Sequence, residues 1–234
     1  MFDTPQLWLT LARLGIILLT TLLGFVTYQS NLLLRRFQPE FNLLLSPPEL
    51  VIRIILVGVC LLLAWLSGLS ADQLGLTVVN PLWSVGLGVS IGLVTQVSVY
   101  FFTVWAIKQF GRHIYSPLVI RNILPRRPLE WIPVSLALVP AVAMEELLFR
   151  TLWLGVFSEV LPLAVLILLT SVVFGLMHLP QGTLGVFLTG GINIFFCLLF
   201  VWTGELVVSL IAHYSVNLLQ LIVAYHQRDW LENY

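Results

Sequence analysis

Seven long apolar stretches, separated by polar or turn-forming residues, dominate the pattern of the chain. They cover residues 7–27, 50–69, 81–107, 131–158, 161–179, 183–203 and 205–226. A bilayer core roughly 30 Å thick needs about 20 apolar residues in a helix that rises 1.5 Å per residue. The pattern therefore predicts an all-α, polytopic transmembrane helix bundle of about seven spans.

The basic residues fall on one side of this predicted membrane protein. Of the eleven Lys and Arg residues, eight lie outside the predicted spans, in the first loop, the third loop and the C-terminal tail: Arg35, Arg36, Lys108, Arg112, Arg121, Arg126, Arg127 and Arg228. With seven spans these segments share one side, which the positive-inside rule makes cytoplasmic. We therefore expect the N-terminus outside and the C-terminus in the cytoplasm.

Composition narrows the classes of function. The chain is 59% hydrophobic and 9% charged, whereas a soluble domain carries about 25% charged residues. The formal net charge is zero, so charge gives no reason to expect a nucleic-acid partner. The pattern predicts a multi-pass integral membrane protein surrounded by the lipid bilayer, and it indicates no particular oligomeric state.

Ionisable residues stand inside the fourth apolar stretch, where each costs on the order of 2.5–3.5 kcal/mol at the bilayer centre. Glu145 and Glu146 are adjacent, and adjacent helix positions point about 100° apart, so we expect the two carboxylates to have different roles. Glu146 and Arg150 are i,i+4 neighbours in the orientation that favours an ion pair. Glu145 has no partner nearby in the sequence and is the better candidate for a general base. A purely structural cluster, in which all three residues hold helices together, explains this segment equally well.

Two histidines stand in later apolar stretches. His178 lies near the end of the fifth stretch. Taken alone, this position favours the interpretation that His178 is only a hydrogen-bond donor at the membrane interface. His213 and Asn217 lie in the seventh and are four residues apart, so a helix presents both on one face. That pair could also serve only to join helices within the bilayer.

Helix geometry predicts that these polar groups meet. If the fourth helix turns at residues 159–162 into the fifth, Glu145 and His178 lie roughly 21 and 24 Å from the turn, and so at about the same depth in the cytoplasmic half. His213 and Asn217 lie roughly 12 and 18 Å from the outer end of the seventh span. Groups from the fourth, fifth and seventh helices should therefore converge on one level.

A carboxylate and two imidazoles around one cavity suit hydrolysis. Glu145 with His178 could hold and deprotonate a water, while His213 with Asn217 could donate hydrogen bonds to the oxyanion. The same Glu145, His178 and His213 could instead bind a divalent metal such as zinc, which would acidify the water. The HExxH signature of many zinc proteases is absent, so the pattern does not by itself establish a metal cofactor.

Residues 88–92 of the third stretch fit two short patterns at once. Gly-x-Ser-x-Gly is the nucleophile elbow of soluble α/β hydrolases, but that motif needs a strand before it. Gly88 and Gly92 also form the GxxxG pattern of closely packed membrane helices. The packing interpretation is favoured.

Three motifs resemble those of the CPBP intramembrane proteases, the group that includes type II CAAX prenyl endopeptidases and bacteriocin-processing or immunity proteins. The family patterns Glu-Glu-x-x-x-Arg, Phe-x-x-x-His and His-x-x-x-Asn/Asp are met without departure by Glu145-Glu146…Arg150, Phe174…His178 and His213…Asn217. The resemblance covers roughly residues 131–220, while the first 130 residues match nothing specific.

The resemblance implies an endopeptidase that cuts a membrane-anchored or lipidated protein or peptide near the cytoplasmic face. It implies a catalytic base at Glu145, with His178 holding the water. By the same resemblance His213 and Asn217 support the oxyanion, and Glu146 and Arg150 are supporting residues. The family is often called metalloprotease, although a metal-free glutamate mechanism has also been argued for it.

On this basis the chain divides into N-terminal membrane helices with a cytoplasmic loop (1–130), a protease core (131–226) and a short cytoplasmic tail (227–234). Two other functions are compatible with the same residues. One is a proton-coupled carrier with Glu145, His178 and His213 as a relay, although no paired broken helices support it. The other is a non-catalytic membrane scaffold or immunity factor.

Overall fold

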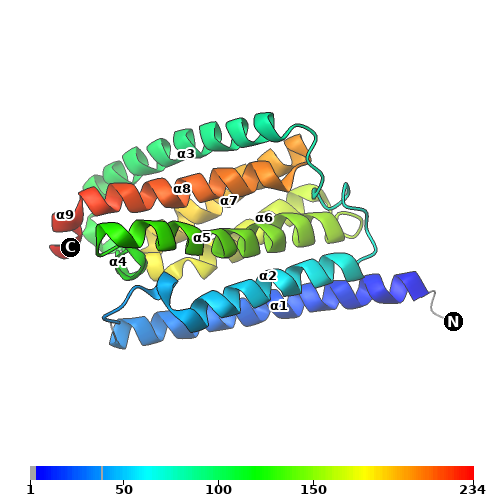
Figure 1. Ribbon diagram of the computed structural model, residues 1–234, viewed down its shortest axis with the longest axis horizontal. Coiled ribbons are helices and arrows are strands. Elements are labelled where there is room, and N and C mark those ends of the chain that lie inside the picture. The colour runs from blue at the N-terminus through cyan, green and yellow to red at the C-terminus, as the bar shows by residue number, and fades with distance from the viewer. Residues whose placement is uncertain (1–3, 38) are drawn as a thin grey trace.

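The protein is an all-helical bundle, as the apolar pattern predicts. Its structure, a computed structural model, describes residues 4–37 and 39–234, and every regular element within them is a helix. The long helices lie along one common direction, with the start of α1 and the short α9 at opposite ends (Figure 1). The helices are α1 (Thr4–Arg36), α2 (Pro47–Leu66), α3 (Pro81–Phe110), α4 (Leu118–Ile123), α5 (Trp131–Glu146), the π-helix η4 (Leu147–Val156), α6 (Leu163–Met177), α7 (Gly182–Thr203), α8 (Leu206–His226) and α9 (Arg228–Glu232), with short 3-10 turns η1 (Leu43–Leu45), η2 (Arg112–Ile114), η3 (Pro128–Glu130) and η5 (Leu179–Gln181).

Six helices in the described part of the chain are long and apolar enough to cross a bilayer, which makes this a multi-pass membrane protein. The predicted span at 161–179 falls short of that length. It is the 15-residue α6, which begins after Pro162 and ends at Met177, and 15 residues rise only about 22 Å. His178 and the 3-10 turn η5 follow at once, so the α-helix does not continue into α7.

The basic segments gather at one end of the bundle, which we call the basic end. Arg126 of the third loop donates hydrogen bonds to the carbonyl oxygens of Pro39 and Glu40 in the first loop. Arg112 donates to the carbonyl oxygen of Asn233 in the C-terminal segment, at 3.2 Å. This grouping is what the positive-inside interpretation requires, while the orientation itself stays a prediction.

Three basic residues expected in loops extend helices instead. Arg35 and Arg36 form the last turn of α1, and Lys108 lies in the last turn of α3. Hydropathy marks where apolar residues end, but a helix continues as long as its backbone hydrogen bonds do. The predicted boundaries were therefore too short at this end.

The π-helix η4 lies at the centre of the bundle. Nine of its ten residues are buried, and Leu148, Phe149 and Leu152 belong to the largest apolar core together with Ile16 of α1 and Leu166 of α6. The surrounding helices therefore bury this short segment on all sides.

Close packing of α3 against α8 depends on two glycines. A Cβ atom on Gly88 would lie 2.9 Å from the carbonyl oxygen of Val208, and one on Gly92 would lie 2.7 Å from that of Ala212. Any larger residue would push the two backbones apart. The GxxxG interpretation of residues 88–92 is confirmed.

Candidate active site

The motif with two glutamates lies where the backbone changes from α-helix to π-helix. α5 ends at Glu146, and η4 carries the chain on to Val156. A π-helix bonds i to i+5, which shifts side chains around the axis relative to an α-helix, and such segments occur frequently at functional sites. The expected hairpin follows, because η4 ends at Val156 and α6 begins at Leu163.

Glu146 and Arg150 form the expected ion pair. Arg150 Nε lies 3.2 Å from Glu146 Oε2, and both side chains are 0% exposed. The guanidinium carbon also lies 5.9 Å from the ring centre of Phe174 and 5.7 Å from that of Phe196. Two aromatic rings within about 6 Å stabilise a desolvated cation. Arg150 is thus held by one carboxylate and two rings.

His213 lies between the two glutamates. Its Nδ1 is 2.7 Å from Glu146 Oε1, and its Nε2 is 3.6 Å from Glu145 Oε2. Glu146 is buried and accepts a hydrogen bond from Nδ1–H, which fixes the ring and turns Nε2 toward Glu145. The side chain of Glu145 is 28% exposed. The two adjacent carboxylates therefore meet opposite nitrogens of one imidazole, Glu146 as a buried group and Glu145 as a partly exposed one.

His178 follows the last residue of α6 and is fixed by the phenylalanine of its own motif. Its Nδ1 lies 2.8 Å from the carbonyl oxygen of Phe174, so Nδ1–H donates and Nε2 keeps a free lone pair. The Phe174 ring lies 4.5 Å from the His178 ring and 6.2 Å from the His213 ring, centre to centre. Phe174 thereby orients one histidine and separates it from the other.

His178, His213 and Asn217 share the wall of one cavity of about 600 Å³, which extends toward Lys108 and Tyr115 at the basic end. The structure thus brings together the groups expected from the fifth and seventh helices. Glu145 is not among the residues that line the cavity, and its carboxylate meets the site through the contact with Nε2 of His213.

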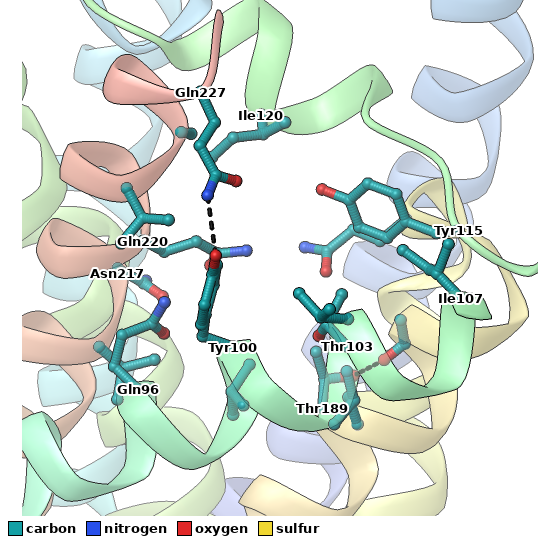
Figure 2. Close-up of a pocket in the computed structure, with 18 of the residues that line it drawn as sticks. Gln96, Tyr100, Thr103, Ile107, Tyr115, Ile120, Thr189, Asn217, Gln220 and Gln227 are labelled. Atoms are coloured by element: carbon teal, nitrogen blue, oxygen red, sulfur yellow. Dashed lines mark hydrogen bonds between the residues drawn. The ribbon is translucent and has the colours of Figure 1, made fainter. Parts of the chain in front are cut away.

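The cavity also has a wall that the sequence motifs did not reveal. Gln96, Tyr100 and Thr103 of α3 point into the space that Asn217 and Gln220 of α8 also face (Figure 2). The signal was present in the sequence, because Gln96 is a polar residue in an apolar span, one helical turn after Gly92. A helix that presents Gly88 and Gly92 to α8 presents Gln96 to it as well.

The possible metal site at Glu145, His178 and His213 stays a prediction. Among residues 4–37 and 39–234, no group of three or more His, Cys, Asp or Glu side chains is close enough to hold a metal ion. Nδ1 of His213 and Nδ1 of His178 are engaged with Glu146 and with a backbone carbonyl. The chemistry proposed below is written with protein side chains and water, and the metal alternative is left to a chelator test.

Comparison with known proteins adds one match. Residues 127–219 match the family model of the type II CAAX prenyl endopeptidases, Rce1-like. That range contains all three motifs and nearly coincides with the region 131–220 in which the resemblance was seen. No curated protein and no solved structure matches the chain.

Proposed function

We propose that this membrane protein is an intramembrane endopeptidase, because residues 127–219 match the Rce1-like model of the type II CAAX prenyl endopeptidases. Its substrate is a membrane-anchored or lipidated protein or peptide, and the reaction is hydrolysis of a peptide bond. One observation carries the proposal: His213, on the cavity wall, is held between Glu146 at 2.7 Å and Glu145 at 3.6 Å.

The first step uses Glu145 and His178. A water hydrogen-bonds to the Glu145 carboxylate and to the free Nε2 of His178. Its oxygen attacks the carbonyl carbon of the scissile bond while one proton passes to Glu145. A carboxylate and a neutral imidazole can both accept from the same water, so its lone pair stays directed at the substrate.

The oxyanion that forms accepts hydrogen bonds from Nε2–H of His213 and from the carboxamide of Asn217. The carbon–nitrogen bond then breaks, and Glu145 returns its proton to the leaving amine. The new carboxylic acid then gives up the second proton of the water, which the amine takes, so a carboxylate and an ammonium product result and the active site is restored.

Glu146 and Arg150 hold His213 in its donor state. A protonated His213 faces a carboxylate on each side, at Nδ1 and at Nε2. Two carboxylates, one guanidinium and one imidazolium sum to zero charge, so the cluster carries no net charge into the low-dielectric interior. In this role Glu146 and Arg150 are positioning residues.

The site faces the cytoplasm in this proposal. The cavity extends from His213 to the basic end, and basic segments mark the cytoplasmic side of membrane proteins. The substrate then enters from the cytoplasmic half of the bilayer, with the N-terminus of the chain outside and its C-terminus inside.

Proteolysis by the purified full-length chain in detergent tests the proposal. The substrates are lipidated and unlipidated membrane-anchored peptides, and the products are identified by mass spectrometry. We expect Glu145→Gln to lower kcat by about 10²- to 10⁴-fold, the range for loss of a general base. Glu159→Gln, in the exposed turn before α6, should leave kcat unchanged.

Each other outcome has a defined meaning. Equal cleavage by wild type and Glu145→Gln would show that Glu145 is not the general base. If a chelator abolishes cleavage and added zinc restores it, the reaction depends on a metal and the metal-free mechanism is wrong. If no peptide is cleaved but the reconstituted chain moves protons across liposomes, the carrier interpretation would stand instead.

A further inference from the structure

Three carboxamide side chains in the cavity have no protein partner. Gln96, Asn217 and Gln220 all line it, and in the described part of the chain none of their side chains forms a hydrogen bond with another protein group. Gln96 is 5% exposed, and its Oε1 atom is buried without a partner. A buried amide oxygen without a partner costs about 1–3 kcal/mol, and a ligand in the cavity would satisfy the one on Gln96.

The carboxamides lie on rows that begin at the catalytic groups. Along α8 the row runs through His213, Asn217 and Gln220, at helical spacings of four and three residues, and Gln227 follows directly after the helix. Gln227 donates a hydrogen bond to the hydroxyl of Tyr100, at 2.9 Å (Figure 2).

On α3 a corresponding row of residues continues from Gly92, which contacts α8. Gly92, Gln96 and Tyr100 are four residues apart and share one helix face. The two helices are in backbone contact at Gly92, and the larger side chains beyond it line the cavity.

We propose that Gln96 positions the substrate as an extended peptide, by pairing its carboxamide with a main-chain N–H and C=O next to the scissile bond. A carboxamide carries a donor and an acceptor side by side, as a neighbouring β-strand does. A helical substrate could not use this wall, because its main-chain groups are already bonded internally. The inference deepens the proposed function, since it takes the ligand of the cavity to be the peptide that is cut.

The length of the row gives the size of the bound segment. Gln227 lies fourteen positions after His213, which corresponds to about 21 Å at the rise of a helix. An extended strand rises about 3.3 Å per residue. About six substrate residues therefore span the cavity from the cut to the basic end.

Ester substitution in the substrate distinguishes a hydrogen bond from Gln96 to the peptide from a purely structural role of Gln96. The substrates are the anchored peptides described above and analogues in which one amide at a time is replaced by an ester, which removes one main-chain N–H. For the wild type we expect one ester near the cut to raise KM about 3- to 10-fold with kcat nearly unchanged, the effect of one net hydrogen bond.

Gln96→Leu should raise KM of the all-amide peptide by a similar factor and should lose its response to that ester. Gln109→Leu is the matched control, because Gln109 lies on the same helix, is exposed and does not line the cavity. Gln96→Met serves as a second variant if Gln96→Leu does not accumulate as folded protein. Equal KM and equal ester response in Gln96→Leu and wild type would overturn the inference.

A binding measurement separates this inference from the protease proposal. Fluorescent versions of the same peptides are titrated into full-length Glu145→Gln protein, with and without Gln96→Leu. Weaker binding only in the Gln96 variant supports the peptide site even if nothing is cleaved, and the protease proposal alone then fails. Cleavage without any dependence on Gln96, or no peptide binding at all, overturns the peptide site.

Discussion

Two glutamate–arginine pairs of the same spacing lie in different surroundings. Glu49 and Arg53 near the start of α2 approach to 3.0 Å, with side chains 44% and 23% exposed. Glu146 and Arg150 at the start of η4 approach to 3.2 Å, with both side chains fully buried. The residue types, order and i,i+4 interval are identical, so any difference in role comes from what surrounds each pair.

The two pairs differ in how solvent and neighbouring side chains affect their charges. At Glu49–Arg53, solvent and headgroups compete for both charges, and such a pair contributes about 0–1 kcal/mol. At Glu146–Arg150, desolvation offsets much of the attraction, so the pair is a poor source of stability. Its distinct feature is the contact of Glu146 with His213. The buried pair thus serves to hold an imidazole, while the exposed pair at most supports its own helix.

Breaking the buried pair should give the largest effect. Arg150→Met removes the guanidinium that pairs with the buried Glu146 carboxylate and should destabilise the fold by about 3–5 kcal/mol. Arg53→Met should change stability by no more than about 0.5 kcal/mol. Thermal unfolding in detergent, with the folded fraction measured by size-exclusion chromatography, compares the two variants. Equal loss of folded protein would show that burial does not distinguish the pairs.

Neutralising the carboxylate behind His213 should affect the reaction more specifically. Glu146→Gln removes the charge that faces Nδ1 of His213, and kcat should fall about 10²- to 10⁴-fold, as when an amide replaces a carboxylate behind a catalytic histidine. Glu49→Gln should leave kcat unchanged. The peptide assay is normalised to folded protein. An unchanged kcat for Glu146→Gln would contradict the positioning role.

Removing both buried charges should restore stability but not activity. The double variant Glu146→Gln with Arg150→Met leaves no orphaned charge in the core, and such replacements are often neutral or stabilising. We expect it to regain about 1–3 kcal/mol relative to Arg150→Met alone and to stay inactive. If the double variant were as unstable as Arg150→Met, the pair would be needed for the fold itself.

Salt should produce the smallest effect, and only at the exposed pair. The Debye length falls from about 10 Å at 0.1 M to 3 Å at 1 M salt, which screens exposed charges far more than buried ones. The difference in stability between Arg53→Met and wild type should therefore vanish at 1 M salt. The difference for Arg150→Met should stay nearly constant, as measured by the same unfolding experiment.

The site could be predicted from the sequence only as far as helix periodicity reaches. The pairing of Glu146 with Arg150 follows from four-residue spacing, and the convergence of His178 with His213 follows from counting residues along two helices. The contact of His213 with both glutamates could not be predicted, because it joins residues 67 apart in the chain. Gln96 was missed because its place on the cavity wall depends on how α3 packs against α8.

The apolar stretches, the all-helical fold and the basic segments that share one end were determined by the sequence alone. These features depend on transfer of side chains into lipid and on hydrogen bonds between near neighbours, both of which are local properties. Only the tertiary structure decided that α6 is too short to meet the spanning length, that the chain widens into a π-helix at the glutamates, and which arginine is buried. Those outcomes depend on which helix faces pack together, a choice that residues far apart in the chain make jointly.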